Sequence, residues 1–438
     1  MTPVDTVINA RWIVPVEPDN TVLAHHSLVL KQGRIVDLLP TASARARYAA
    51  TDSVELPTHV VIPGLINAHT HACMSLFRGL ADDLPLMDWL QNHIWPAEAK
   101  WVSAGFVRDG TALAMAEMLK SGTTCFSDMY FFPEAAALAA REAGMRAAIG
   151  LILIDFPTAY AQTPDEYIEK GLRLHDELRH DPLIRTTFAP HAPYTVSDGP
   201  LQRLRTINNE LNLPLLMHVH ETAHEVDDAV AKTGKRPLAR LDGLDLVNPS
   251  LVAVHMTQLT DTEIARLAEA GASVVHCPES NLKLASGFCP VHKLLTAGVN
   301  VALGTDGAAS NNDLDMLGEL RTAALLAKAV SHDATAVPAR TALRMATLNG
   351  AKALGIDFET GSLVAGKAAD LAAIDLAALP SQPVYDPVSQ LVYTANRDQV
   401  SDVWVAGRRL LANRVLTTLD EAAILRRAQG WRDKIAAS

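Results

Sequence analysis

The sequence predicts an α/β fold: a TIM-like (β/α)8 barrel with a small composite β-sandwich domain built from both chain ends. Three observations predict it. Strand-like runs alternate with helical segments from about residue 61, β-branched runs occupy both ends of the chain, and polar residues close several of the apolar runs. A chain of 438 residues is also too long for one small core, so a large and a smaller domain are expected.

The first 60 residues are expected to be β structure. The runs VINARWIVPV, HHSLVLKQG and RIVDLLP are short and rich in β-branched residues, and Pro-Asp-Asn and Gly turns separate them. We therefore assign residues 1–60 to the N-terminal part of the β domain.

Residues 61–357 are expected to form the barrel. Ala/Leu/Glu-rich segments with helical periodicity, such as DGTALAMAEMLKSG and DTEIARLAEAGA, separate the apolar runs. An open doubly wound sheet is the alternative, but it would not bring the first, fifth and eighth strand ends to one point. The candidate strands are 61–69, 123–128, 147–155, 185–191, 214–221, 251–257, 273–277 and 299–306.

Beyond residue 357 the β signals return. GSLVAGKAADLAAIDL and QVSDVWVAGRRLL are typical of strands, and DEAAILRRAQGWRDKI is typical of a closing helix. Residues 358–438 are therefore expected to complete the β domain and to add that helix.

Composition excludes several classes of protein. The net charge is −11 and the basic residues are scattered, so nucleic-acid binding is not expected. The most apolar stretch, AAIGLILI, is too short to span a membrane, and the N-terminus lacks a signal-peptide pattern. The four cysteines form no CxxC pair, which predicts free thiols and a cytoplasmic protein, with Cys73 and Cys277 near the polar strand ends.

Histidines and acids stand where the candidate barrel strands end. Residues two apart in a strand point to one face, so His69 and His71 can reach the same ion. Three imidazoles and one carboxylate on rigid strands suit one divalent metal with room for a water, which predicts a hydrolytic enzyme. The residues concerned are His69 and His71 in VVIPGLINAHTH, His218 and Glu221 in PLLMHVHE, His255 in LVAVHM and Asp306 in VNVALGTD.

Each of these signals is weak when it is taken alone. With 16 histidines, about one His-x-His pair is expected by chance, and His218 and His220 form a second pair. Asp306 could be a turn residue, and Glu221 could be an acid at a helix N-terminus. The metal-site interpretation prevails because a charged group at the end of a buried strand must be paired, hydrogen-bonded or metal-bound.

Longer motifs carry a resemblance that covers essentially the whole chain. PGLINAHTH, HVHET, the strand with His255 and LGTDGAASNN resemble the amidohydrolase superfamily. FRGLADDLPLMDWLQNHIWPAE, APHAPYTVS and PESNLKLASG resemble its branch of methylthioadenosine/S-adenosylhomocysteine deaminases. The fourth strand, RTTFAPHAPY, offers His191 where binuclear members carry a bridging lysine or glutamate, so one metal is favoured.

The resemblance also implies roles for single residues. Asp306 would accept a proton from the attacking water, Glu221 would pass one to the ring nitrogen, and His255 would orient the water. Glu98 resembles the acid that accepts bonds from ribose hydroxyls, and His191 the histidine facing the purine or sugar. The implied metal ligands are His69, His71, His218 and Asp306, the implied substrate contacts are Glu98, His191, Glu221 and Asp306, and weaker candidates are Trp89, Trp95, Ser280 and Asn281.

The implied reaction is the hydrolytic deamination of an adenosine-type nucleoside, with one divalent ion: Zn²⁺ first, with Fe²⁺ and Mn²⁺ as alternatives. No Lys or Arg occurs between Ala147 and Glu169, which favours methylthioadenosine over S-adenosylhomocysteine, whose carboxylate tail suits an arginine. A homo-oligomer is also implied. The alternatives are a deaminase of guanine, 8-oxoguanine, cytosine or a triazine, and a non-catalytic scaffold.

Overall fold

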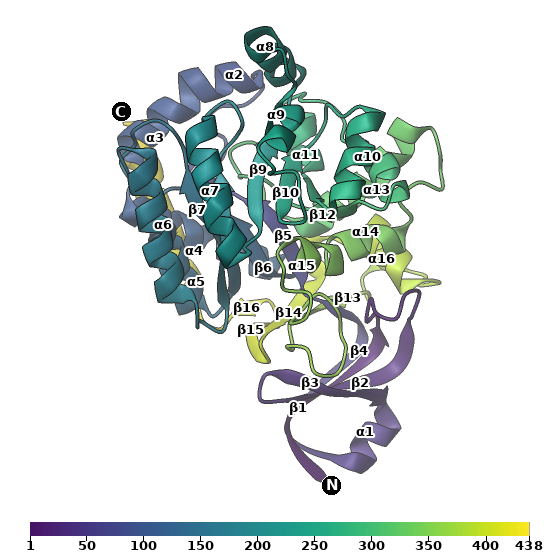
Figure 1. Cartoon of the computed structure of the whole chain (residues 1–438). Helices are drawn as coiled ribbons and strands as arrows, with labels where there is room; N and C mark the ends of the chain where they lie inside the picture. Colours follow the sequence, from purple (N-terminus) through teal and green to yellow (C-terminus); the bar gives the residue numbers. More distant parts are fainter. Residues whose placement is uncertain (438) are drawn as a thin grey trace.

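Two eight-stranded sheets build the molecule, as the computed structural model of residues 1–437 shows (Figure 1). One sheet is parallel, with neighbours in chain order from β5 to β12. Both the barrel and the second sheet from the two chain ends confirm the predicted fold class. The barrel strands are β5 (Leu65–Thr70), β6 (Thr123–Asp128), β7 (Arg146–Leu153), β8 (Ile184–Pro190), β9 (Leu215–Val219), β10 (Leu251–His255), β11 (Ser273–His276) and β12 (Asn300–Leu303).

The barrel closes where the chain beyond β12 meets β5. The Asp306 N–H donates to the His69 carbonyl at 3.0 Å. Just before it, the Asn67 side chain accepts from the Thr305 N–H at 3.0 Å and donates to the Thr305 hydroxyl at 2.7 Å. Gly304 permits this approach, because a Cβ there would lie 2.8 Å from the His69 nitrogen.

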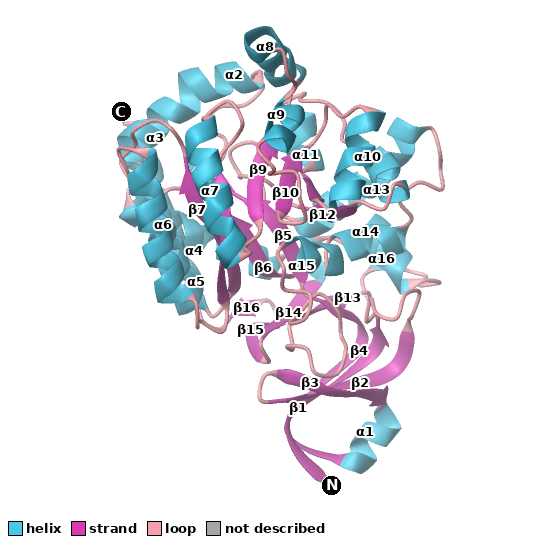
Figure 2. Cartoon of the chain, viewed as in Figure 1, coloured by secondary structure: helices cyan, strands magenta, loops and turns pink. Residues whose placement is uncertain are grey.

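Helices surround the parallel strands (Figure 2). Three of them begin at a threonine whose hydroxyl accepts the backbone N–H of a glutamate three residues on: Thr163, Thr222 and Thr260. The helices of this layer are α4 (Ala104–Lys120), α5 (Pro133–Ala143), α6 (Pro164–Leu178), α7 (Asp198–Leu211), α8 (Ala223–Thr233), α9 (Pro237–Gly243), α10 (Asp261–Ala270), α11 (Pro278–Lys283), α12 (Val291–Thr296), α13 (Met316–Ser331), α14 (Ala339–Met345), α15 (Leu348–Ala353) and α16 (Pro387–Tyr393).

A short helical insertion follows β5, before the first long helix. It consists of η1 (Ala72–Phe77), α2 (Leu86–Asp88), the π-helical turn η2 (Trp89–Ile94) and α3 (Trp95–Trp101). Because β5 ends at the carboxyl mouth of the barrel, the insertion lies over that mouth, where active sites of such barrels are found.

The second sheet joins the two ends of the chain. Its order is β16-β15-β14-β13-β4-β1-β2-β3, and β13 lies antiparallel to β4, with Ala373 opposite Val61. Residues from both ends, including Ile8 and Trp404, share one buried core. The bounds are β1 (Thr2–Ile13), β2 (Leu23–Lys31), β3 (Arg34–Pro40), α1 (Thr41–Arg47), β4 (Tyr48–Pro63), β13 (Leu371–Asp375), η3 (Leu379–Ser381), η4 (Arg397–Gln399), β14 (Val400–Val405), β15 (Arg408–Ala412) and β16 (Val415–Leu416).

The structure corrects the predicted first barrel strand. The apolar run from residue 61 is one segment in the sequence, but β4 carries it to Pro63 within the second sheet and β5 starts at Leu65. Gly64 makes the break, since a Cβ there would lie 2.1 Å from the Thr124 side chain. The prediction of a single strand over 61–69 is therefore wrong at its start.

The closing helix, α17 (Glu421–Ala436), lies against α4 of the barrel. The Trp431 ring meets the Phe106 ring edge-on at 5.2 Å, and the Trp431 indole N–H donates to Asp109 at 2.9 Å. Within residues 1–437 no helix combines the length and the apolar character needed to cross a membrane.

A buried ion pair connects the two sheets. Arg146, at the start of β7, donates from Nε to Asp370 at 2.7 Å, and the two side chains are 3% and 0% exposed. Asp370 also accepts the Ala406 N–H at 2.6 Å. The pair fixes the amino end of the barrel against the turn before β13.

Replacing Arg146 by Met should lower the free energy of unfolding by about 3–5 kcal/mol, because Asp370 would keep a buried charge without its partner. Thermal or urea unfolding followed by circular dichroism measures this. Arg108→Met, which breaks the exposed pair with Glu142, is the matched control and should cost about 0–1 kcal/mol. Equal losses in the two variants would contradict a role for burial.

Candidate active site

Four side chains from three distant segments meet at the carboxyl mouth of the barrel. His69 and His71 come from the end of β5, His218 from β9, and Asp306 from the turn after β12. One ligand atom of each lies within 4.8 Å of the others. The Nε2 atoms of His69 and His218 are 3.1 Å apart, and Asp306 Oδ1 lies 3.4 Å from His69 Nε2 and 3.2 Å from His71 Nε2.

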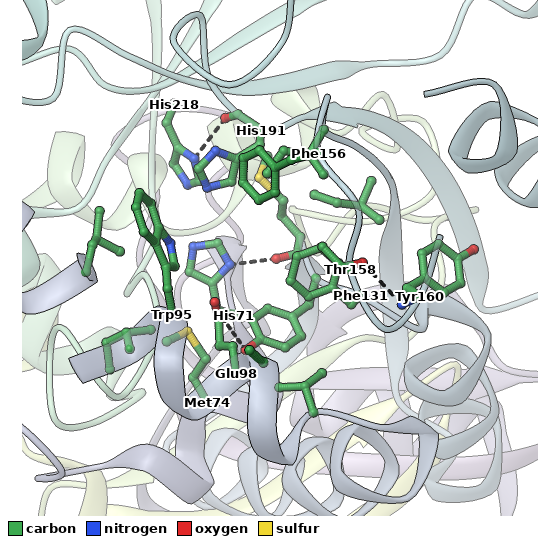
Figure 3. A pocket seen from close by; sticks show the side chains of 18 of the residues that line it. His71, Met74, Trp95, Glu98, Phe131, Phe156, Thr158, Tyr160, His191 and His218 are labelled. Atoms are coloured by element: carbon green, nitrogen blue, oxygen red, sulfur yellow. Dashed lines mark hydrogen bonds between the residues drawn. The ribbon is translucent and has the colours of Figure 1, made fainter. Parts of the chain in front are cut away.

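Backbone carbonyls orient two of the imidazoles. His71 Nδ1 lies 2.6 Å from the Met129 carbonyl, and His218 Nδ1 lies 2.9 Å from the His191 carbonyl. Because a carbonyl only accepts, each Nδ1 must carry the proton, which directs Nε2 toward the shared centre. Figure 3 shows both contacts.

Asp306 is held from one side only. Its Oδ2 accepts from the Ser280 hydroxyl at 2.7 Å and the Ser310 hydroxyl at 2.8 Å. Its Oδ1 is buried and has no well-aligned hydrogen bond among the described residues. A buried carboxylate oxygen left in this way is the kind of group that a cation satisfies.

The electrostatics fit a divalent metal. Burial lowers the pKa of His69 to about 4 and that of His218 well below its ordinary value, so both are neutral near pH 7 and can offer their facing Nε2 atoms to a cation. Burial opposes ionisation of Asp306, but the contacts with His69 and His71 lower its pKa well below the usual range. A set of three imidazoles and one carboxylate can therefore hold one divalent ion.

His71 has the opposite shift. Burial lowers its pKa, but Asp306 and the Met129 carbonyl outweigh burial and raise it to about 9. A proton and a metal ion therefore compete for this imidazole, so metal binding is coupled to proton release.

Glu221 and His255 lie beside this cluster. Glu221 Oε2 is 3.9 Å from His255 Nε2, and both residues are buried. His255 Nδ1 donates to Asn281 Oδ1 at 2.9 Å, which leaves Nε2 as an acceptor facing the cavity. Burial raises the pKa of Glu221, so its carboxyl can carry a proton closer to neutral pH than an exposed glutamate.

A cavity of about 520 Å³ opens from the cluster (Figure 3). Glu98 lines the same cavity and accepts a hydrogen bond from the Tyr130 hydroxyl at 2.5 Å. Burial raises the pKa of Glu98 to about 6, although the Tyr130 bond opposes the shift. Apolar and aromatic side chains make much of the wall: Leu86, Trp89, Trp95, Phe131, Phe132, Ile152, Ile154 and Phe156.

The structure brings most of the sequence-predicted residues into this cavity. Glu98, His191, Trp89 and Trp95 all line it. Two weaker candidates differ, because Ser280 and Asn281 lie behind the site and hold Asp306 and His255. Neither residue lines the cavity.

Cys73 and Cys277 were expected near the polar strand ends. Cys73 lies beside Tyr130, and Cys277 lies close enough to Asp306 for the carboxylate to help raise its pKa, but neither belongs to the metal-type cluster of the described residues. Sequence reasoning missed Tyr130, Phe131 and Tyr194. For Tyr130 and Phe131, the available signal was the run MYFFP directly after the second barrel strand.

A parallel barrel that gathers three imidazoles and a carboxylate at the carboxyl ends of its strands has the architecture of a metal-dependent hydrolase. The model of the amidohydrolase family matches residues 60–410. The chain belongs to the amidohydrolase family.

Individual relatives cover the whole chain. A protein of Saccharophagus degradans named 5-methylthioadenosine/S-adenosylhomocysteine deaminase is 54% identical over 100% of this chain and 98% of its own length. A crystal structure of an adenosine deaminase from Xanthomonas campestris with bound zinc superposes with a TM-score of 0.99 at 55% identity, covering 100% of both chains. A zinc complex of atrazine chlorohydrolase from Arthrobacter aurescens shares the fold, with a TM-score of 0.90 at 23% identity, over 98% of this chain and 100% of its own.

Replacing His218 by Ala should remove bound metal, because one of the four converging donors is lost. His220→Asn is the matched control: His220 is buried two residues away, but its Nε2 accepts the Leu238 N–H and it lies outside the cluster. Metal content per chain, measured by inductively coupled plasma mass spectrometry, should fall at least about tenfold for His218→Ala alone. Equal metal in the two variants would show that His218 is no ligand.

Proposed function

We propose that the protein is a metal-dependent aminohydrolase that converts an adenosine-type nucleoside to its inosine analogue and ammonia. One observation carries the proposal: the histidine and carboxylate cluster and the Glu98–Tyr130 pair face one apolar cavity. Such a cavity can hold a purine with its amino group at the cluster and its sugar at Glu98. The names of the full-length relatives support the same chemistry.

His69, His71, His218 and Asp306 would hold a single divalent ion. Zinc is favoured, as in the Xanthomonas campestris structure, although Fe²⁺ and Mn²⁺ suit the same donors. When bound, such an ion lowers the pKa of water to about 7 and so supplies a nucleophile at neutral pH.

The remaining chemistry is proton transfer by the chain's own residues. The purine C6–N bond breaks and a C6–O bond forms, so the ring nitrogen and the leaving amine each need a proton. Glu221, with its raised pKa, donates to the ring nitrogen and takes back the second proton of the attacking water as the C6 carbonyl forms, while Asp306 accepts the first proton of that water and passes it to the amine. His255 accepts at Nε2 and orients the water.

Glu98 and His191 would recognise the nucleoside. An ionised Glu98 accepts hydrogen bonds from two ribose hydroxyls, and Tyr130 fixes its carboxylate. His191 lines the cavity between the cluster and Tyr194, with its Nδ1 3.0 Å from the Thr195 hydroxyl, and faces the purine or the sugar.

The cavity wall favours an uncharged group at the 5′ position. The segment without Lys or Arg contributes Ile152, Ile154 and Phe156 to the cavity wall, where we expect the 5′ group. No Lys or Arg occurs among the described residues that line it. A methylthio group can bury its apolar surface in this wall, whereas the carboxylate of S-adenosylhomocysteine would find no cationic partner.

Ammonia release from a substrate panel tests the proposal directly. Metal-analysed protein should deaminate methylthioadenosine with a kcat/KM above those for S-adenosylhomocysteine, adenine and guanine. A higher kcat/KM for S-adenosylhomocysteine would contradict the assignment of the 5′ wall. Faster turnover of guanine or another free base would overturn the nucleoside assignment.

The role of Glu98 predicts a pH effect limited to nucleosides. Because the pKa of Glu98 is about 6, its carboxylate is protonated below that pH, and kcat/KM for methylthioadenosine should fall as the pH drops through about 6. Glu98→Gln should lower kcat/KM about 10–100-fold for the nucleoside, since one strong acceptor is lost.

Adenine is the internal control for this experiment. It lacks the ribose, so its kcat/KM should change little in Glu98→Gln. Parallel losses for adenine and methylthioadenosine would assign Glu98 a role in folding or chemistry rather than in sugar recognition.

A homo-oligomeric state and a cytoplasmic location remain predictions from the sequence.

A further inference from the structure

The turn after β9, which carries Glu221, has an unfavourable backbone geometry at His220. His220, directly before Glu221, has φ +54°, in the left-handed region that non-glycine residues rarely adopt. The turn cannot continue the strand ladder there, so its backbone groups need other partners. These partners come from two residues outside the proposed chemistry.

Glu225 accepts both N–H groups of the turn. Its Oε1 lies 3.0 Å from the His220 nitrogen and its Oε2 lies 2.7 Å from the Glu221 nitrogen. Glu225 stands in the first turn of α8. The backbone N–H of Glu225 donates to the hydroxyl of the N-cap residue Thr222 at 3.2 Å. One carboxylate therefore fixes two consecutive amides, and charge makes these hydrogen bonds strong.

Thr257 holds the same turn from its carbonyl side. The Thr257 N–H donates to the His220 carbonyl at 3.0 Å, and the Thr257 hydroxyl lies 2.7 Å from the Glu221 carbonyl. Thr257 follows β10 and stands two residues after His255. The contact therefore links the segment of the water-orienting histidine to the segment of the proton donor.

The Glu221 side chain itself has no such support. Among the described residues its carboxyl has no hydrogen-bond donor, and His255 Nε2 is 3.9 Å away. Its direction is therefore set by the backbone that carries it. This leaves both carboxyl oxygens free for substrate.

The neighbouring helix α10 shows that this arrangement is not an ordinary cap. There Glu263 occupies the equivalent place after Thr260, but its carboxylate returns to the Thr260 N–H at 2.9 Å and pairs with Arg236. The carboxylate of Glu225 instead binds the N–H groups of His220 and Glu221, the two residues before the N-cap residue Thr222. The same sequence spacing thus supports the start of the helix in α10 and the turn of Glu221 before α8.

We propose that Glu225 and Thr257 are positioning residues for Glu221. Together they bind all four backbone polar groups of the His220–Glu221 turn and hold the Glu221 carboxyl toward the ring nitrogen. This inference rests on the proposed function, in which Glu221 protonates that nitrogen.

The test compares single and double variants in steady-state deamination of methylthioadenosine. Burial raises the pKa of Glu225 to about 7, so assays at pH 8 keep it ionised. Glu225→Gln should lower kcat about 10–100-fold with metal content unchanged and KM little affected, because a displaced proton donor slows the chemical step. Glu221→Gln alone should lower kcat about 10²–10⁴-fold.

The double variant Glu221→Gln/Glu225→Gln separates positioning from general stability. If Glu225 acts through Glu221, the double variant should be no slower than Glu221→Gln. Multiplied losses would overturn the proposal. Thr257→Val should behave like Glu225→Gln in both backgrounds, whereas the control Glu263→Gln should keep the wild-type kcat.

Hydrogen exchange provides a readout that needs no substrate. In Glu225→Gln the peptide spanning residues 218–226 should exchange faster by mass spectrometry, since the two N–H groups bind different oxygens of Glu225 and glutamine replaces one of them by an NH2 donor. Unchanged exchange would contradict the contact. A wild type that releases no ammonia would contradict the proposed function, whereas a fully active wild type with multiplied losses would contradict only the role of Glu225.

Discussion

The hydrogen bond between the Asp306 N–H and the His69 carbonyl is the contact on which the site depends. It closes the barrel between β5 and the chain beyond β12, and both residues belong to the proposed metal-binding set. Closure of the barrel and spacing of the ligands are therefore one geometric constraint. Asn67 and Thr305 reinforce it, and Gly304 and Gly307 let the two segments approach so closely.

Polar groups behind the site direct the groups inside it. Carbonyls orient His71 and His218, an amide oxygen orients His255, and two hydroxyls leave a single Asp306 oxygen facing inward. A buried polar atom is costly unless it is hydrogen-bonded, so each supporting bond removes alternative orientations. Within the cluster, Asp306 Oδ1 still lacks a partner, and a cation can satisfy it.

The cavity has ionisable groups at one end and a largely apolar wall. The apolar wall strengthens electrostatic interactions inside. The insertion after β5 supplies Glu98 and several wall residues, and the segment after β7 supplies Phe156. In the proposed function, loops at the barrel mouth determine the substrate, whereas the strand ends determine the chemistry.

Much of this could be predicted from the sequence because the relevant signals are local. Hydrophobic periodicity located all eight barrel strands, and polar residues at their ends marked the cluster. The break at Gly64 was not predictable, since only the approach of Thr124 from β6 requires it.

What the sequence alone determined was which residues stand at strand ends, because the alternation of apolar and polar side chains depends on neighbours along the chain. Tertiary structure alone decided that Ser280 and Asn281 support the site from behind, that Tyr130 holds Glu98, and that Glu225 holds the turn of Glu221. These contacts join segments whose separation is set by barrel closure and side-chain packing. Local periodicity carries no information about such distances.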